Sequence, residues 1–235
     1  MRLRAAGGAF IVDPLAPALC GPAVAWHAAY LADARARGLA PILSLSFELL
    51  AQHCPEAWQQ RAADGSPART GWSPPSALLS PAQPEAMAWL RRVGAALARL
   101  MREAGVTVRV QIGEPWWWID PAGRPCLYDA AARRRFGGNP PVIADCGAPL
   151  DAARRTLLDQ AGAVLAEATG ALRDAIRAAV APLPAEVLLL VFLPGVLDPA
   201  RPEVRRANLP TGWAAPAYDR LQIEDHDWLT AGADA

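Results

Sequence analysis

Apolar runs and helical periodicities alternate along this chain. Short apolar or β-branched runs bounded by Gly and Pro are typical of strands buried on both faces. Longer stretches with a repeat near 3.6 residues, ended by Gly38, Gly105 or Pro182, indicate helices. The pattern predicts helices over 23–37, 84–103 and 150–180. It predicts strands over 38–47, 106–112, 187–193 and 219–224, and a weaker one over 9–13.

The order of these elements predicts the fold class. Helices that connect buried strands act as crossovers, and crossovers produce a parallel sheet. We therefore expect a single α/β domain over residues 1–235 with a TIM-barrel-like (β/α) plan. The pattern yields about five strands, whereas barrel closure needs eight. Either some strands are hidden in the pattern, or the barrel is incomplete and belongs to a longer polypeptide.

Composition excludes several classes of partner. The formal net charge is zero and all 23 basic residues are arginine, so no basic excess favours nucleic acid or anionic lipid. No apolar run reaches about 18 residues, which argues against membrane insertion. The first ten residues lack the apolar stretch of a signal peptide. The four cysteines form no CxxC pair, so we expect neither a metal nor a cofactor.

The segment 113–118, Gly-Glu-Pro-Trp-Trp-Trp, carries the strongest chemical signal. It follows the strand predicted over 106–112, and a carboxylate there would lie at the catalytic end of a barrel strand. Glu114 is therefore a candidate catalytic residue. Neighbouring side chains on an extended chain point to opposite sides, so at least one of Trp116, Trp117 and Trp118 is expected to line a cleft. The alternative is that all three plug the barrel mouth.

Glu224 ends the last predicted strand and would face the same rim as Glu114. Two carboxylates at one rim are what glycoside hydrolysis requires, with about 5 Å between them for retention and about 6.5 to 9.5 Å for inversion. The alternative is that either glutamate is paired with an arginine. Further candidates for substrate contacts lie on the same predicted strand ends and the loops beside them, namely Glu48, Trp72, Trp213, Asp225 and Trp228.

Several motifs in order resemble the glycoside-hydrolase-like barrel domains of phage and gene-transfer-agent tail proteins, and more broadly clan A glycoside hydrolases. They are Ser-Leu-Ser-Phe-Glu-Leu at 44–49, Thr-Gly-Trp-Ser-Pro-Pro at 70–75, Gly-Glu-Pro-Trp-Trp-Trp at 113–118, Cys-Leu-Tyr-Asp at 126–129 and Leu-Gln-Ile-Glu-Asp-His-Asp-Trp at 221–228. The resemblance to clan A implies that Glu114 is the acid/base and Glu224 the nucleophile of a retaining enzyme. Gly113 departs from it, because clan A has an asparagine there.

The resemblance to tail proteins implies a virion component that is assembled in the cytoplasm and then resides in a phage or gene-transfer-agent tail. Its partners would be other tail proteins and a glycan of the cell envelope. Two functions stay open, beside a third alternative of an α/β domain with an unrelated function whose glutamates are ordinary rim residues. One is a hydrolase acting on that glycan through Glu114 and Glu224. The other is an inactive structural or carbohydrate-binding module, favoured by Gly113 and the small number of strands.

Overall fold

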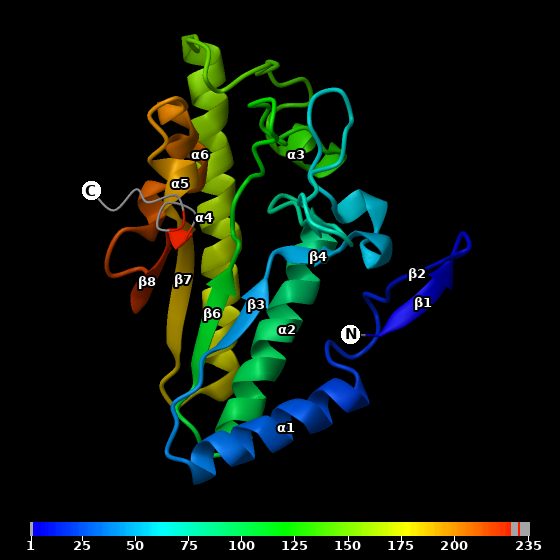
Figure 1. The fold of residues 1–235 in the computed structure, drawn as a ribbon, viewed down its shortest axis with the longest axis vertical. Helices are drawn as coiled ribbons and strands as arrows, with labels where there is room; N and C mark the ends of the chain where they lie inside the picture. The colour runs from blue at the N-terminus through cyan, green and yellow to red at the C-terminus, as the bar shows by residue number, and fades with distance from the viewer. Residues whose placement is uncertain (1, 227–229, 231–235) are drawn as a thin grey trace.

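A four-stranded parallel sheet forms the centre of the molecule (Figure 1). The computed structural model describes residues 2–226 and 230. The sheet has the order β3 (Leu43–Ser46), β6 (Arg109–Gly113), β7 (Glu186–Phe192) and β8 (Arg220–Glu224), and each neighbouring pair is parallel. These strands confirm four of the predicted strands. All four end at the same edge, as the βα plan requires.

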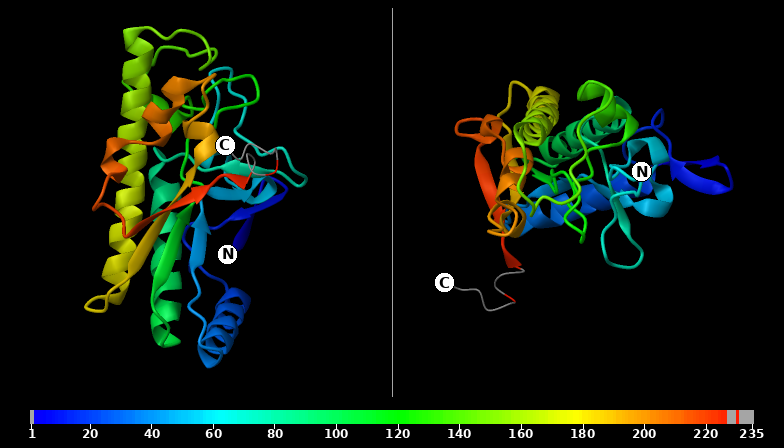
Figure 2. Two further views of the ribbon diagram at one scale, coloured as in Figure 1. Left: turned by 60° about the vertical axis from the view of Figure 1, so that its left-hand side comes forward. Right: turned by 90° about the horizontal axis from the view of Figure 1, so that it is seen from above.

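One face of the sheet is apolar and covered by helices. Leu45, Ile112 and Leu189 occupy one row across β3, β6 and β7 and are buried. The covering helices are α2 (Pro84–Glu103) and α4 (Ala152–Val180), which also pack against each other (Figure 2). Burial of this face supplies the hydrophobic driving force for the fold.

The covering layer is uneven at its two sides. Helix α1 (Gly21–Ala36), whose buried residues are Leu31 and Ala34, contacts α2 and lies crosswise at the lower end of the molecule, below the start of β3 (Figure 1). On the other side, β8 carries Leu221 and Ile223 in the same rows as buried residues of β7. Both remain exposed, at 45% and 52%. The helical layer therefore stops short of β8.

The opposite face of the sheet carries polar side chains on β3, β6 and β8, whereas β7 contributes Leu188 and Leu190 to it. The Ser44 hydroxyl donates to Gln111 Oε1 at 2.6 Å, and Gln111 Nε2 donates to Gln222 Oε1 at 2.6 Å. Nearer the start of the strands, Glu186 accepts from Arg109 and Arg220 in ion pairs of 2.8 and 2.5 Å. This face corresponds to the interior of a closed barrel, and here its polar groups satisfy one another across the strands.

Short elements surround the upper end of the sheet. Strands β4 and β5 form an antiparallel pair, and the connection after β6 holds α3, while α5 and α6 follow β7. Their bounds are β4 (Glu48–Leu50), β5 (Ser76–Leu78), α3 (Ala130–Arg135), α5 (Leu193–Val196) and α6 (Arg205–Asn208), with 3-10 turns at Ala51–His53, Glu56–Trp58, Pro202–Val204 and Thr211–Trp213.

The weak strand predicted over 9–13 was assigned to the wrong sheet. It exists as β2 (Ala9–Val12), but it pairs antiparallel with β1 (Leu3–Ala6) in a separate hairpin. Gly7 and Gly8 form the turn with φ of 55° and 80°, which glycine adopts readily. Within the described part of the chain, the barrel-like sheet therefore has four strands and two open edges, at β3 and β8.

Candidate functional site

Three glutamates gather at the carboxyl ends of the sheet strands. Glu114 directly follows β6, Glu224 ends β8, and Glu48 begins β4 two residues after β3. Their charges act on one another: the carboxylates of Glu114 and Glu224 both raise the pKa of Glu48. The sequence prediction that these side chains meet at one rim therefore agrees with the structure, and we call them the rim glutamates.

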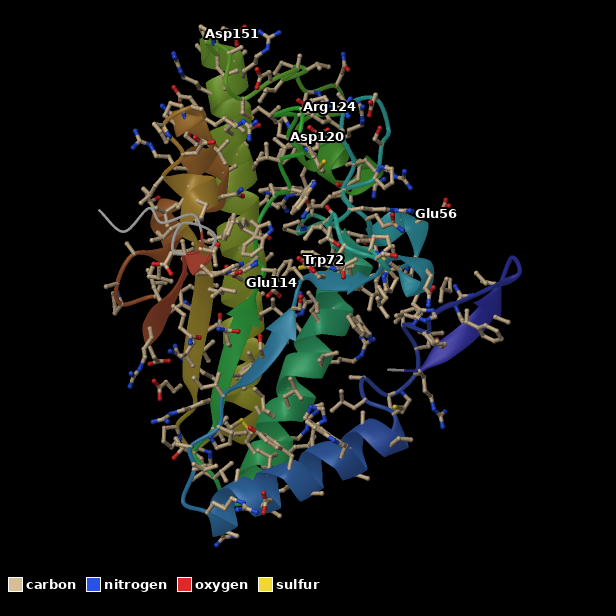
Figure 3. All side chains as sticks on the ribbon, viewed as in Figure 1. Glu56, Trp72, Glu114, Asp120, Arg124 and Asp151 are labelled. Atoms are coloured by element: carbon tan, nitrogen blue, oxygen red, sulfur yellow. The ribbon has the colours of Figure 1, made fainter. Side chains whose placement is uncertain are left out.

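Glu114 lies in a strained and partly desolvated position, at the upper end of β6 (Figure 3). Its φ is 50°, a left-handed conformation unusual for a residue other than glycine. Its Oε2 is buried without a hydrogen-bond partner. Burial raises the pKa of Glu114 and the charge of Glu224 adds to this, while a hydrogen bond with Ser46 opposes it. Backbone strain of this kind is typical of functional sites.

Gly113 is required by a close approach between β6 and β3. A Cβ at this position would lie 2.9 Å from the Ser44 hydroxyl and 3.3 Å from the Leu45 carbonyl oxygen. Neither the side-chain hydroxyl, which is bonded to Gln111, nor the strand backbone moves away cheaply. The asparagine that clan A carries here therefore does not fit this sheet without a shift of β3.

Glu48 is half-buried beside the other two carboxylates. Burial first, and then the charge of Glu114, raise the pKa of Glu48 to about 7, against a hydrogen bond with Ser76. Glu224 Oε1 lies 3.3 Å from Nδ1 of His226. No arginine forms an ion pair with any rim glutamate among the described residues, so the alternative of an arginine-paired glutamate finds no support there. The rim therefore concentrates negative charge without guanidinium neutralisation.

Two buried amides hold the tryptophan segment in place. Trp117 N donates to Asn208 Oδ1 at 2.8 Å, and Asn208 Nδ2 donates to Trp117 O at 2.9 Å. Gln60 does the same on the other side: it accepts from Trp118 N at 2.8 Å and donates to Trp116 O at 2.9 Å. Sequence reasoning missed both amides, because isolated Gln and Asn residues outside any long periodic pattern carry no local signal of burial.

The three tryptophans have different surroundings. Trp117 is fully buried and its indole N–H donates to Ala161 O at 2.9 Å, so it belongs to the core rather than to a cleft. Trp116 and Trp118 are partly exposed, and Trp116 packs on Phe192 with ring centroids 5.7 Å apart. One tryptophan is thus buried, as the alternative of a plugged barrel mouth expected for all three, and two are partly exposed, as side chains that line a cleft would be.

A cavity of about 280 Å³ lies beside the tryptophan segment. Its walls come from the segment after β6, the end of β7 and the turns that follow, and include Trp116, Phe192, Asp198, Arg201 and Trp213. Trp213 itself is buried and donates to the Thr169 hydroxyl. No rim glutamate lines this cavity, so the apolar hollow and the carboxylates are neighbouring but separate features.

The remaining candidate residues are scattered. Trp72 is exposed in the loop before β5, near the upper end of β3 in Figure 3. Asp225 directly follows β8, and Trp228 lies outside the described residues. In the part of the chain that is described, no group of three or more His, Cys, Asp or Glu side chains is arranged to hold a metal ion.

A comparison with protein-family models decides the family. The model described as "Non-contractile tail sheath protein TIM barrel" matches residues 1–235. The chain belongs to this family. The family match and the parallel sheet together make this tail sheath TIM-barrel domain a structural module of a phage tail, whose partners are other tail proteins. A search of curated proteins gives no match.

Membership in the tail sheath family refines the expectations drawn from sequence. The predicted phage tail origin and the TIM-barrel plan are confirmed. The sheet of the described residues has four strands and does not close into a barrel. Across the described residues, none of the helices combines the length and the apolar character needed to cross a bilayer.

Proposed function

We propose that this tail sheath domain works by shape and contact in the assembled tail, without turnover of a substrate. The observation that carries the proposal is the family match over the whole chain. The geometry is compatible with it, because the sheet face that would line the interior of a closed barrel is here an open surface whose polar groups are bonded to one another. Gly113 adds support, since the close approach of β3 excludes the asparagine of clan A.

A second candidate is hydrolysis of an envelope glycan by Glu114 and Glu224, as the resemblance to glycoside hydrolases implies. The observation that favours it is the raised pKa of Glu114, because a general acid must keep its proton near neutral pH. Against it, Glu48 adds a further carboxylate beside Glu114, and no arginine ion pair among the described residues offsets that charge.

One experiment separates the two candidates. Purified chain and the Glu114→Gln variant are incubated with cell-wall sacculi and with extracted surface polysaccharide, and newly formed reducing ends are measured. The structural proposal predicts equal, background signal for both proteins. Release by the native chain that falls at least a hundredfold in Glu114→Gln would establish the hydrolase instead. Circular dichroism of both proteins verifies that the variant is folded.

A further inference from the structure

The cavity beside the tryptophan segment has walls that are held in place by hydrogen bonds. The Trp117 backbone is bonded to both amide groups of Asn208, and the Trp117 indole N–H donates to Ala161 O. The indole N–H of Trp213, another wall residue, donates to the Thr169 hydroxyl at 2.9 Å. A ligand that enters between walls of this kind orders few side chains, so binding costs little conformational entropy.

The interior of this cavity is apolar, and its polar side chains lie where solvent reaches. Val196 and Val204 are buried wall residues, whereas Asp198 and Arg201, which lie between them in the chain, are partly exposed. Leu197, beside Asp198, is 52% exposed. The cavity volume of about 280 Å³ lies just below the range of about 300 to 1,000 Å³ that is typical of sites for drug-sized ligands. The space therefore suits one large apolar side chain.

Most hydrogen-bond acceptors in the walls are already used. The carbonyl oxygens of all three tryptophans at 116–118 accept hydrogen bonds. Asn208 Oδ1 accepts from Trp117 N and Asp198 Oδ1 accepts from Ala200 N. Among the described wall residues, this leaves Asp198 Oδ2 as the side-chain oxygen without a hydrogen bond. A sugar ring carries several hydroxyl donors, and most of them would stay unsatisfied in this cavity, which is costly.

Arg201 provides an unused donor close to that unused acceptor. Its guanidinium forms no hydrogen bond or ion pair with the described part of the chain. Arg201 N donates to Asp198 O at 3.1 Å, so one turn of the backbone carries both residues. A carboxylate oxygen and a guanidinium that are not paired with each other match the N–H and the C=O of a peptide group. A sugar ring has no such one-to-one match.

We propose that this cavity binds one large apolar side chain of a neighbouring tail protein, together with the peptide groups beside it. The side chain contacts Trp116 and Phe192, while Arg201 donates to a peptide carbonyl and Asp198 accepts from a peptide N–H. A tail protein is the partner because the family match places this domain in a phage tail. Apolar anchors in pockets that exclude water dominate the binding energy of many protein interfaces. The inference rests on the proposed structural function and gives it a specific contact site.

The test uses N-acetylphenylalanine amide, which has one apolar side chain between two peptide groups. It is titrated into the isotope-labelled chain, and the nuclear magnetic resonance signals of the nine tryptophan indole N–H groups are followed. Trp116→Phe and Trp118→Phe assign the two signals from the cavity wall. Both signals should shift saturably with a millimolar dissociation constant, because the probe supplies one anchor and not a whole interface. Val204→Phe, which fills the cavity, should abolish the shifts.

A pair of variants tests the role of the peptide group. Arg201→Ala should raise the dissociation constant of the amide at least fivefold and leave that of toluene unchanged, because toluene has no peptide group. The matched control is Arg91→Ala: Arg91 is also partly exposed and has no hydrogen bond or ion pair with a described residue, but it lies on α2. This control should bind both probes like the native chain.

Three results would overturn the proposal. They are the absence of a saturable shift with the amide, an equal loss in Arg201→Ala and Arg91→Ala, and shifts caused by methyl glucopyranoside but not by the amide. The last would identify a glycan site. None of them produces reducing ends, so failure of this contact site is distinguishable from failure of the structural function. Circular dichroism confirms that each variant is folded, and Arg201→Ala keeps the test valid if Val204→Phe does not fold.

Discussion

The two faces of the central sheet are stabilised by different interactions. On the covered face, Ile112 and Leu189 are buried under α2 and α4, and water is excluded. On the open face, Ser44, Gln111 and Gln222 form a chain of hydrogen bonds in contact with solvent. The comparison teaches that most apolar burial lies on the covered face, whereas the other face buries Leu188 and is otherwise held by hydrogen bonds and ion pairs.

The open face also differs along its length. Near the strand starts, Glu186 is paired with two arginines. At the strand ends, burial raises the pKa values of Glu48 and Glu114, and the charge of Glu224 adds to both. In the loops well above the rim, Asp120 is a carboxylate neutralised by Arg124 at 2.7 Å (Figure 3). The absence of such pairing at the rim glutamates of the described chain marks them as unusual.

The largest expected effect comes from the covered face. Ile112→Ala removes buried methylene groups and leaves a cavity, which should lower the free energy of unfolding by about 2 to 5 kcal/mol. The matched control is Ile223→Ala on the same side of the sheet, where β8 is uncovered. This substitution should lower the free energy of unfolding by less than about 1 kcal/mol. Urea unfolding measures both, and equal costs would show that β8 is covered as well.

Sequence reasoning was most successful where burial imposes a pattern. The run Val187 to Leu193 and the alternation before Gly113 are long enough to predict strands, and the glycine and proline stops located α2 and α4 within about two residues. The same parallel-strand logic brought Glu114 and Glu224 to one rim. These inferences succeeded because the periodicity reflects the buried face directly.

The features that sequence could not supply depend on contacts between distant segments. Gln60 and Asn208 hold Trp116 to Trp118 across 56 to 91 positions of the chain, and nothing local marks them. The burial of Trp117 follows from those contacts. The strand at Ala9–Val12 was real, but the side chains of its partner β1 are mostly exposed, so no pattern of burial reveals the hairpin.

A pH dependence should arise from Glu48 at the rim of the open face. Its pKa of about 7 in the folded chain exceeds the ordinary 4.5, so the folded state binds the proton more tightly. The stabilisation that protonated Glu48 contributes is therefore fully present below about pH 4.5 and is lost as pH rises through about 7. Because the group is half in water, the change should be well below the about 1.4 kcal/mol expected per pKa unit.

Urea unfolding at pH 5 and pH 8 tests this dependence. In the native chain the free energy of unfolding should be lower at pH 8. In Glu48→Gln, which cannot ionise, the difference between the two pH values should shrink. Glu203→Gln serves as the control, since arginines lower the pKa of Glu203 far from the rim. An undiminished difference in Glu48→Gln would assign the effect to another group.

A smaller effect is expected from the hydrogen-bonded chain on the open face. Gln111→Ala removes the partner of both Ser44 and Gln222, and the net cost of such bonds is about 0.5 to 1.5 kcal/mol. The freed groups can turn to water, which keeps the penalty low. Ile112 is the next residue of the same strand and points to the covered face, so comparison with Ile112→Ala shows how much each face contributes to the free energy of unfolding. A cost for Gln111→Ala as large as that for Ile112→Ala would mean that water does not reach this face.

The smallest effect should come from Arg220, whose side chain is 64% exposed at the edge of β8. Arg220→Ala removes one of the two ion pairs of Glu186, but Arg109 stays 2.8 Å from that carboxylate. Exposed ion pairs contribute about 0 to 1 kcal/mol, so the free energy of unfolding should fall by less than about 1 kcal/mol. Salt should reduce the difference further, because screening acts on exposed charges first. The measurement is urea unfolding of both proteins at low and at high salt. A larger cost that persists at high salt would mean that the edge of β8 is shielded from solvent, and the open face would then be narrower than its four strands.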